Sequence, residues 1–522
     1  MHRIHLSRRR VLAGTGSIAA ALALGPRWSW GADGKILKVR SYADLQVLDP
    51  LARKGAPDDH ITSCTFHNLI KWKAGDKWEW DLDAAEMIEQ VDDTHIKFRL
   101  KPGLKWSGGH GELTAEDVKY SYERIADPKN ESPYKDDFAV LDHVEVTDKH
   151  NGTIILKEYF APLWTSTLPE GSGKIVCKAA VEKAGGKFTT EVPASSGPYI
   201  IKEWTPKQRT VLARNPDYTG SEKPYFDEIH IMPIEDEKTA EIAYEAGDVD
   251  YTGVSLSSLS RFKDSPPANT KLQESPSLAY VWLGMNVEHP TFQDPKVRRA
   301  MQHAIDVDAV LEAAYFGVAK RATGIIAPGL PGHREANKYN YDPEKAKALL
   351  KEAGKEGGFQ TTMSVLNKTE RLSAAQIVQA NLAELGVTVE INPYDSGVFW
   401  SIGDEKSGET WKDIQMIINR FSMSPDPSWA TVWFTPDQIG VWNWERWNSP
   451  EFGQLHKAGL VEKDSAKRDQ MYKRMQDLME ESGAYVFLTH EANAAVYRDN
   501  LAPATEPQGW TGVILPEFKM AG

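Results

Sequence analysis

An aromatic-rich stretch at residues 420–448 contains the side chains best suited to bind a small molecule. Its five tryptophans are Trp429, Trp433, Trp442, Trp444 and Trp447. An indole offers a flat apolar face for stacking and attracts a cation by about 0.5–2 kcal/mol. Buried indole N–H groups need hydrogen-bond partners, so that a crowd of tryptophans is difficult to place in a core. Two interpretations remain: the stretch packs a core, or it forms the wall of a ligand site.

A second group of residues has the spacing of metal ligands. His60, Cys64 and His67 stand at i, i+4 and i+7, on one face if the segment is helical. They supply three ligands, but the neighbouring sequence offers no evident fourth. The apolar residues Phe66 and Leu69 indicate that the segment packs inward. We therefore expect no bound metal and no other cofactor.

Signatures of catalysis and of nucleotide binding are missing from the sequence. It has no G-x-S-x-G elbow, no phosphate loop ending in G-K-S/T and no H-E-x-x-H motif. The segment "HEANA", which begins at His490, lacks the second histidine. The sequence thus predicts a protein that is not an enzyme.

The elements that must position these residues show a mixed α and β pattern. Residues 94–100 alternate between apolar and polar side chains, as in a strand. The next helix begins after Thr114, whose capping box is completed by Asp117. Asp294 and Asp342 each precede a proline and cap two later helices. The apolar stripes of these helices predict a buried scaffold.

The first 32 residues have the layout of an export signal. Arg8 and Arg9 precede an apolar run that begins at Val11 and is shorter than the roughly 20 residues of a membrane span. The paired arginines resemble a twin-arginine signal. No cysteine lies near the end of the run to carry a lipid. We expect export to the periplasm by the twin-arginine route, without a lipid anchor.

Length and charge restrict the class of protein. A chain of 522 residues is too long for one ordinary core, so two or more domains are expected. Its net charge of −13 repels nucleic acid and anionic lipid, and no later segment approaches a membrane span. We therefore expect no nucleic-acid partner and no direct membrane insertion. Cys64 and Cys177 form a disulfide only if their Cα atoms come within bridging distance.

A series of short motifs covers nearly the whole chain after the signal. They include "KPGLKWSGGHGELTAEDV", "SSGPYII", "ARNPDY", "YEAGDVD", "FQDPKVRRA", "AID", "YDPEKAKALLKEAG" and "WNSPEFGQL", spread over residues 96–455. In content and order they resemble the motifs of ABC-transporter solute-binding proteins of family 5, the peptide- and nickel-binding class. Each motif alone is weak, but the series is specific.

This resemblance implies an α/β fold of the type 2 periplasmic binding protein class, with two lobes of mixed sheets and an extra subdomain in the first lobe. The first lobe would comprise residues 33–272, with the subdomain at about 70–190. Residues 273–488 would form the second lobe, and residues 489–522 would return to the first. The chain would cross between lobes near residues 273–282 and 484–493. Such a hinge lets a ligand that contacts both lobes favour a closed state.

The resemblance also suggests where the ligand binds. Peptide-binding members hold the ligand's amino group with an aspartate that lies shortly before a D-P pair, next to a tryptophan. Asp426 and Pro427 match the pair, but Met423 stands at the aspartate position and Arg420 at the tryptophan position. Methionine cannot pair with an ammonium group, whereas arginine binds a carboxylate or phosphate. Arg420 either binds an anionic ligand group or pairs with Asp426. A peptide with a free amino group would need Asp426 or Asp395 in place of the missing aspartate, so Asp426 is also a candidate ligand residue.

Further candidates for the ligand site are mostly aromatic. Trp400, Trp429 and Trp433 are suited to line the cavity, with core packing as the alternative. Gln46 and Val47 lie in a segment that resembles the one along the ligand in the first lobe.

The resemblance implies the substrate-binding component of an ABC importer, which we expect to be monomeric and periplasmic. It would capture a small-molecule or peptide ligand, such as an oligopeptide, an opine or another modified amino acid, and deliver it to an inner-membrane permease complex. A metal or metal-chelate receptor of the nickel type is the alternative, and an exported enzyme is a third hypothesis.

Overall fold

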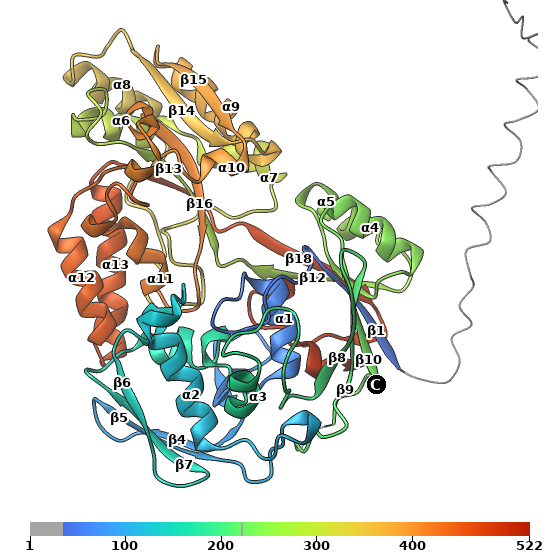
Figure 1. Ribbon diagram of the computed structural model, residues 1–522. Coiled ribbons are helices and arrows are strands. Elements are labelled where there is room, and N and C mark those ends of the chain that lie inside the picture. Colours follow the sequence, from blue (N-terminus) through green and yellow to red (C-terminus); the bar gives the residue numbers. More distant parts are fainter. Residues whose placement is uncertain (1–34, 221–222) are drawn as a thin grey trace, which may run out of the picture. The chain divides into compact units, whose positions relative to one another are not determined.

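Two mixed β-sheets organise the part of the chain that the computed structural model describes, residues 35–220 and 223–522 (Figure 1). The export signal predicted at residues 1–32 lies outside the described residues. The unit Ile36–Gly522 holds both sheets and is described alone below.

The first sheet has seven strands. In spatial order they are β12 (Thr270–Pro276), β18 (Ala492–Arg498), β11 (Tyr251–Gly253), β1 (Ile36–Ser41), β10 (Glu228–Pro233), β9 (Arg209–Arg214) and β8 (Tyr199–Thr205). Strand β1 pairs in parallel with β10 and β11, and the other pairs are antiparallel. Helices α4 (Glu237–Ala246) and α5 (Leu256–Asp264) share a buried cluster with β18.

An antiparallel sheet of four strands follows within the first half of the chain. Its order is β4 (Ala85–Gln90), β5 (His95–Leu100), β7 (Asn151–Leu156) and β6 (Leu141–Val146). The side chains of β5 alternate between buried and more exposed, as the sequence predicts for a strand with one face on a core. Its core also receives side chains from α1 (Ala56–Thr65), α2 (Ala115–Ala126) and α3 (Lys178–Lys183). A short hairpin, β2 (Ile70–Trp72) and β3 (Trp80–Leu82), precedes it.

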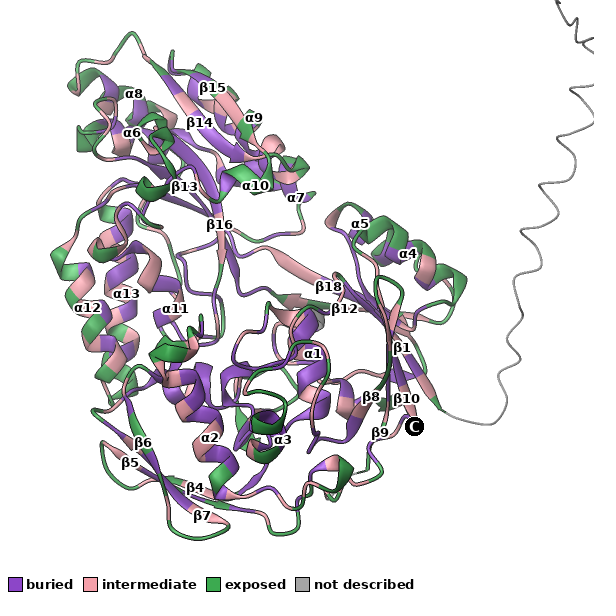
Figure 2. Ribbon diagram, viewed as in Figure 1, coloured by how far each residue is buried: buried purple, intermediate pink, exposed green. Residues whose placement is uncertain are grey.

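The second mixed sheet has five strands, in the order β15 (Thr388–Tyr394), β14 (Gln360–Leu366), β16 (Met416–Ser422), β13 (Ala279–Met285) and β17 (Tyr485–Thr489). Helices α6 (Pro295–Ala304), α7 (Val307–Tyr315), α8 (Pro343–Glu352) and α9 (Thr369–Ala383) share its main buried cluster. Every residue of β13 is buried, which explains its continuous apolar sequence (Figure 2).

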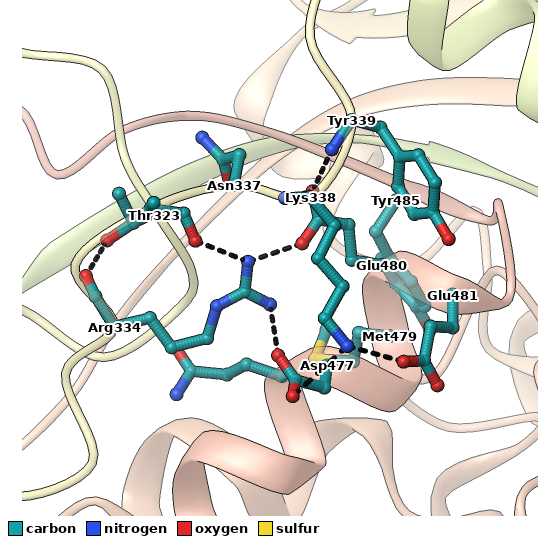
Figure 3. A network of polar contacts seen from close by, with 12 residues as sticks. Thr323, Arg334, Asn337, Lys338, Tyr339, Asp477, Met479, Glu480, Glu481 and Tyr485 are labelled. Carbon is teal, nitrogen blue, oxygen red and sulfur yellow. Dashed lines mark hydrogen bonds and ion pairs between the residues drawn. The ribbon is translucent and has the colours of Figure 1, made fainter.

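The other side of this sheet packs against a second group of helices. They are α11 (Ser428–Thr431), α12 (Pro450–Val461) and α13 (Ser465–Glu481), and α10 (Ser396–Phe399) lies in a separate small cluster. Near its end, α13 holds the loop before α8 through buried charges (Figure 3). Arg334 pairs there with Glu480 and Asp477, and the Glu480 carboxylate accepts the backbone N–H groups of Lys338 and Tyr339.

Helix boundaries follow the predicted capping signals. The capping box of Thr114 and Asp117 begins α2, and the side chains of Asp294 and Asp342 accept backbone N–H groups at the starts of α6 and α8. Gly354 adopts φ 69° just after α8, a conformation that glycine tolerates well. No helix in residues 35–220 and 223–522 is both long and apolar enough to cross a bilayer.

The chain passes between the two mixed sheets at two places. Residues Ser277 and Leu278 join β12 to β13, and residues His490 and Glu491 join β17 to β18. Both junctions bring residues to the cavity described next.

Candidate ligand-binding site

A cavity of about 910 Å³ is lined by residues of both mixed sheets and of both junctions. We name its two sides by their place in the chain. Wall A consists of the lining residues before Ser277 and after Glu491, which belong with the first sheet. Wall B consists of the lining residues from Ser277 to Glu491, which belong with the second sheet.

Strand β16 and helix α9 place the cationic groups of wall B. Met416 and Ile418 lie in the same buried cluster as residues of α9. Arg420 follows them at the same two-residue spacing, so its side chain leaves the same face of the strand. The first turn of α9 brings Lys368, Glu370 and Arg371 to the cavity.

Glu491 connects the two arginines of wall B. Its carboxylate oxygens lie 2.5 Å from an Nη atom of Arg371 and 2.9 Å from Nε of Arg420. Burial favours the neutral acid, but the two guanidinium groups hold the pKa of Glu491 at about 2. Arg371 also donates to the hydroxyl of Tyr315 and is buried.

Arg420 keeps part of its guanidinium group available to the cavity. Its side chain is 41% exposed, and only its Nε has a side-chain partner among the described residues. Tyr42 of wall A also lines the cavity. Burial raises the pKa of Tyr42, and the nearby charge of Arg420 opposes that shift. The two terminal nitrogens of Arg420 thus form a fork that fits a carboxylate.

Wall A carries more acidic than basic side chains. Its charged residues are Arg40, Lys174, Asp59, Glu170, Glu235, Glu237 and Glu506, five acids against two bases. Burial raises the pKa of Glu170 to about 8, and repulsion from Glu506 adds to the shift. Burial also raises the pKa of Glu506 and lowers that of Lys174. Because Glu170 and Glu506 are buried away from water, a cationic ligand group nearby would stabilise their ionised forms.

Acidic and basic side chains are therefore divided unequally between the two walls of the cavity. Wall B has three bases, Lys368, Arg371 and Arg420, against the two acids Glu370 and Glu491. A solute with a carboxylate at one end and a cationic group at the other matches this division, with its carboxylate at wall B.

Three of the predicted ligand residues line the cavity: Arg420, Met423 and Trp400. Met423 is buried, and Trp400 is 36% exposed. The cavity lining does not include Trp429, Trp433, Gln46 or Val47. The backbone N–H groups of Gln46 and Val47 instead donate to the carboxylate of Asp58.

Asp426 does not line the cavity either, because it forms a buried ion pair. Its two carboxylate oxygens accept from one Nη atom of Arg468 at 2.8 and 2.9 Å, and Thr165 donates to it at 2.6 Å. Burial opposes ionisation, but Arg468 lowers the pKa of Asp426 below its usual value. The alternative pairing of Arg420 with Asp426 is wrong: each residue has another partner.

Four of the five tryptophans of residues 420–448 pack against one another, and the fifth packs against other aromatic side chains. Trp429 contacts Trp433, which contacts Trp442, which stacks on Trp444. Trp447 packs edge-on against Phe452 and Tyr485. In this stretch the residues that reach the cavity are Arg420, Ser422 and Met423. Packing is thus the role of the aromatic side chains here, while the polar end of β16 faces the cavity.

The spacing of His60, Cys64 and His67 has another explanation than metal binding. Helix α1 ends at Thr65, so His67 lies beyond it. His67 pairs with Asp83 at 2.9 Å, and His60 lies 3.2 Å from the backbone oxygen of Thr511. No group of three or more metal-ligating side chains is found in the described part of the chain. Cys64 and Cys177 are both free and buried, without a disulfide.

Several cavity residues were not predicted from the sequence. Glu491, Arg371 and the acids of wall A belong to no recognisable local pattern. Glu491 follows the apolar run of β17 at a predicted chain crossing, which is the one signal that could have identified it.

Comparisons with known proteins identify the family of this chain. The family model described as bacterial extracellular solute-binding proteins, family 5 Middle, matches residues 79–440. The glutathione-binding protein GsiB of Escherichia coli (strain K12) is 26% identical over 498 residues, 94% of this chain and 96% of that protein.

Two solved structures show the same fold. The ABC transporter substrate binding protein CtaP from Listeria monocytogenes has a TM-score of 0.82 at 21% identity, covering 94% of this chain and 100% of that chain. AgaA from A. tumefaciens R10, in complex with agropinic acid, has a TM-score of 0.73 at 22% identity, covering 93% and 99%. The predicted type 2 periplasmic binding protein fold is confirmed. The chain belongs to the bacterial extracellular solute-binding proteins of family 5.

Proposed function

We propose that this protein is the periplasmic substrate-binding component of an ABC importer for a peptide-like or modified amino-acid solute. The solute has a carboxylate that binds to Arg420 and a cationic group that faces wall A. The protein delivers it to an inner-membrane permease complex. Relatives with related cargo support this class, since GsiB is named for glutathione and AgaA was solved with agropinic acid.

The observation that carries the proposal is the open guanidinium fork of Arg420 in a cavity between two sheets. A carboxylate that accepts two hydrogen bonds from one guanidinium group is held in a fixed orientation. Met423, beside it in the lining, supplies apolar contact and no charge. The division of charge between the walls then sets the direction in which a zwitterionic solute lies.

The lobes predicted from the motifs give the capture mechanism. The first lobe carries wall A and the second carries wall B, and residues 277–278 and 490–491 act as the hinge. Export by the twin-arginine route, through Arg8 and Arg9, delivers a monomer to the periplasm. Replacing both arginines with lysine should lower the amount found in the periplasmic fraction.

The direct test is to identify the natural cargo. The protein is purified from its native periplasm and analysed by native mass spectrometry, and the released molecule is fragmented. We expect a compound that carries both a carboxylate and a cationic group. Arg420→Gln should weaken the binding of that compound by about tenfold or more, because charge-assisted hydrogen bonds contribute about 1.5–3 kcal/mol.

Arg474→Gln is the matched control. Arg474 is also 41% exposed and also paired with carboxylates, but it lies on α13 outside the cavity lining. Its replacement should leave cargo affinity unchanged. A cargo without an anionic group, or an Arg420→Gln variant that binds the cargo as the wild type does, would contradict the proposal.

A further inference from the structure

Wall B holds one internal carboxylate between two guanidinium groups. Glu491 reaches Arg371 and Arg420 with different oxygens, at 2.5 and 2.9 Å. A carboxylate supplied by the protein thus occupies the space between the two arginines. A ligand with two adjacent anionic groups would need the same space for its second group.

The position of Glu491 is fixed by the backbone. The residue lies in the junction between β17 and β18 and adopts φ 53°, which is uncommon for a residue other than glycine. Its backbone N–H donates to the Thr489 hydroxyl at 3.1 Å. Its side chain is 16% exposed, so the carboxylate is largely withdrawn from water while it contacts both arginines.

The ionised groups that meet at Glu491 have a net positive charge of one, which a further negative charge would balance. Arg371 is buried and has Glu491 and Tyr315 as its side-chain partners. Arg420 uses Nε for Glu491, and its side chain lines the cavity and is 41% exposed. Two guanidinium charges against one carboxylate leave a surplus of one positive charge, which a single ligand carboxylate neutralises.

We propose that Glu491 determines the charge selectivity of the cavity, because its carboxylate takes the place of a second anionic group of the ligand. The site then accepts solutes that present one carboxylate to wall B and discriminates against solutes that present two. The inference rests on the proposed function and specifies which solutes the importer takes.

Malonamate and malonate are suitable probes, because they have nearly the same shape and differ by one negative charge. Their dissociation constants are measured by calorimetry at constant ionic strength. In the wild type we expect malonate to bind no more tightly than malonamate. In Glu491→Gln we expect malonate to gain about tenfold or more relative to malonamate, since the dianion now engages both arginines.

Two further variants show whether the gain in malonate affinity depends on Arg420 and on the position of the charge that is removed. Adding Arg420→Gln to Glu491→Gln should abolish the gain. Glu390→Gln removes the same charge from an exposed position of β15 that is outside the cavity lining, and it should leave the ratio of the two probes at the wild-type value.

Folding of the variants does not limit the test. If Glu491→Gln is poorly folded because the arginines lose their carboxylate, malonate should raise its melting temperature more than malonamate does. Glu491→Gly offers the same comparison with a residue that tolerates φ 53°. Either preference for malonate supports the proposal.

A folded Glu491→Gln that keeps the wild-type ratio overturns the proposal, as does a wild type that already prefers malonate tenfold. Equal melting temperatures with the two probes, in both the glutamine and the glycine variant, overturn it as well. The proposed function fails on a different result, a natural cargo without a carboxylate, which is obtained with Glu491 in place.

Discussion

Glu445 is a buried carboxylic acid beside the indole of Trp282. It is 1% exposed, and its Oε1 accepts a hydrogen bond of 2.7 Å from the indole of Trp282. Oε2 has no hydrogen-bond partner among the described residues. Burial raises the pKa of Glu445 from 4.5 to about 7. Because the folded protein holds this proton more tightly than the unfolded chain, the contribution to stability is complete below about pH 4.5 and is lost as the pH rises through 7.

We therefore predict that Glu445→Gln stabilises the protein at alkaline pH. Glutamine can still accept from Trp282 and has no charge to desolvate. The gain should be small at pH 5 and approach about 3 kcal/mol at pH 8–9, given 1.36 kcal/mol for each pKa unit. Thermal unfolding from pH 5 to 9 measures it, with Glu390→Gln as the control. Parallel pH profiles for Glu445→Gln and the wild type would rule the idea out.

Three residues of the site were predicted from the sequence, Trp400 from its aromatic side chain and two others from a local motif. The D-P pair led to Arg420 and Met423, and both line the cavity. The partners of the charged residues were not predictable, because they are distant in sequence. Arg420 pairs with a residue 71 positions away, and Asp426 with one 42 positions away. No local pattern encodes such pairs, which arise when two elements pack together.

Elements were more predictable than partners, since the signals that start and stop a helix lie within a few residues. Asp294 and Asp342, each followed by proline, begin α6 and α8 as expected. The tryptophan stretch left two interpretations open, because composition does not show which way a side chain points. Aromatic side chains suit a core and a ligand wall equally. Trp444 and Trp447 are buried, so they belong to the core.

The loop before α8 is held to α13 by the ion pair of Arg334 and Glu480, both of which are buried. We predict that Arg334→Met destabilises the protein by about 3–5 kcal/mol, because it leaves a buried carboxylate without its partner. Lys338→Met is the control: its bonds to Glu481 and Asp477 are more exposed, so the loss should be about 0.2–1 kcal/mol. Thermal unfolding distinguishes the two variants.

The double variant Arg334→Met with Glu480→Leu extends this comparison. Removing both charges should recover part of the loss, because the isolated carboxylate is then absent. Equal melting temperatures for Arg334→Met and Lys338→Met would show that the buried pair is not what fixes the loop.

The fold class was predicted from the resemblance carried by the order of the motifs and not from local physics. Neither periodicity nor composition indicates that β12 and β18 are neighbours, although they lie far apart in the chain. The same pairing keeps the two junctions close together, since each junction adjoins one of these strands. Two short, adjacent junctions allow one sheet to rotate relative to the other with little change elsewhere.

We therefore predict that the cargo-loaded protein is more compact than the cargo-free protein. A solute that contacts Arg420 of wall B and the acids of wall A stabilises the state in which the walls are close, by no more than its difference in affinity for the two states. Small-angle X-ray scattering of the purified protein, before and after removal of its cargo, measures the radius of gyration. The radius should increase when the cargo leaves and return when it is added back.

Arg420→Gln should require about tenfold more cargo for the same decrease, because the contact with wall B is weakened. If the radius stays constant while calorimetry shows saturated binding, the two junctions do not act as a hinge, and the solute enters a cavity of fixed geometry.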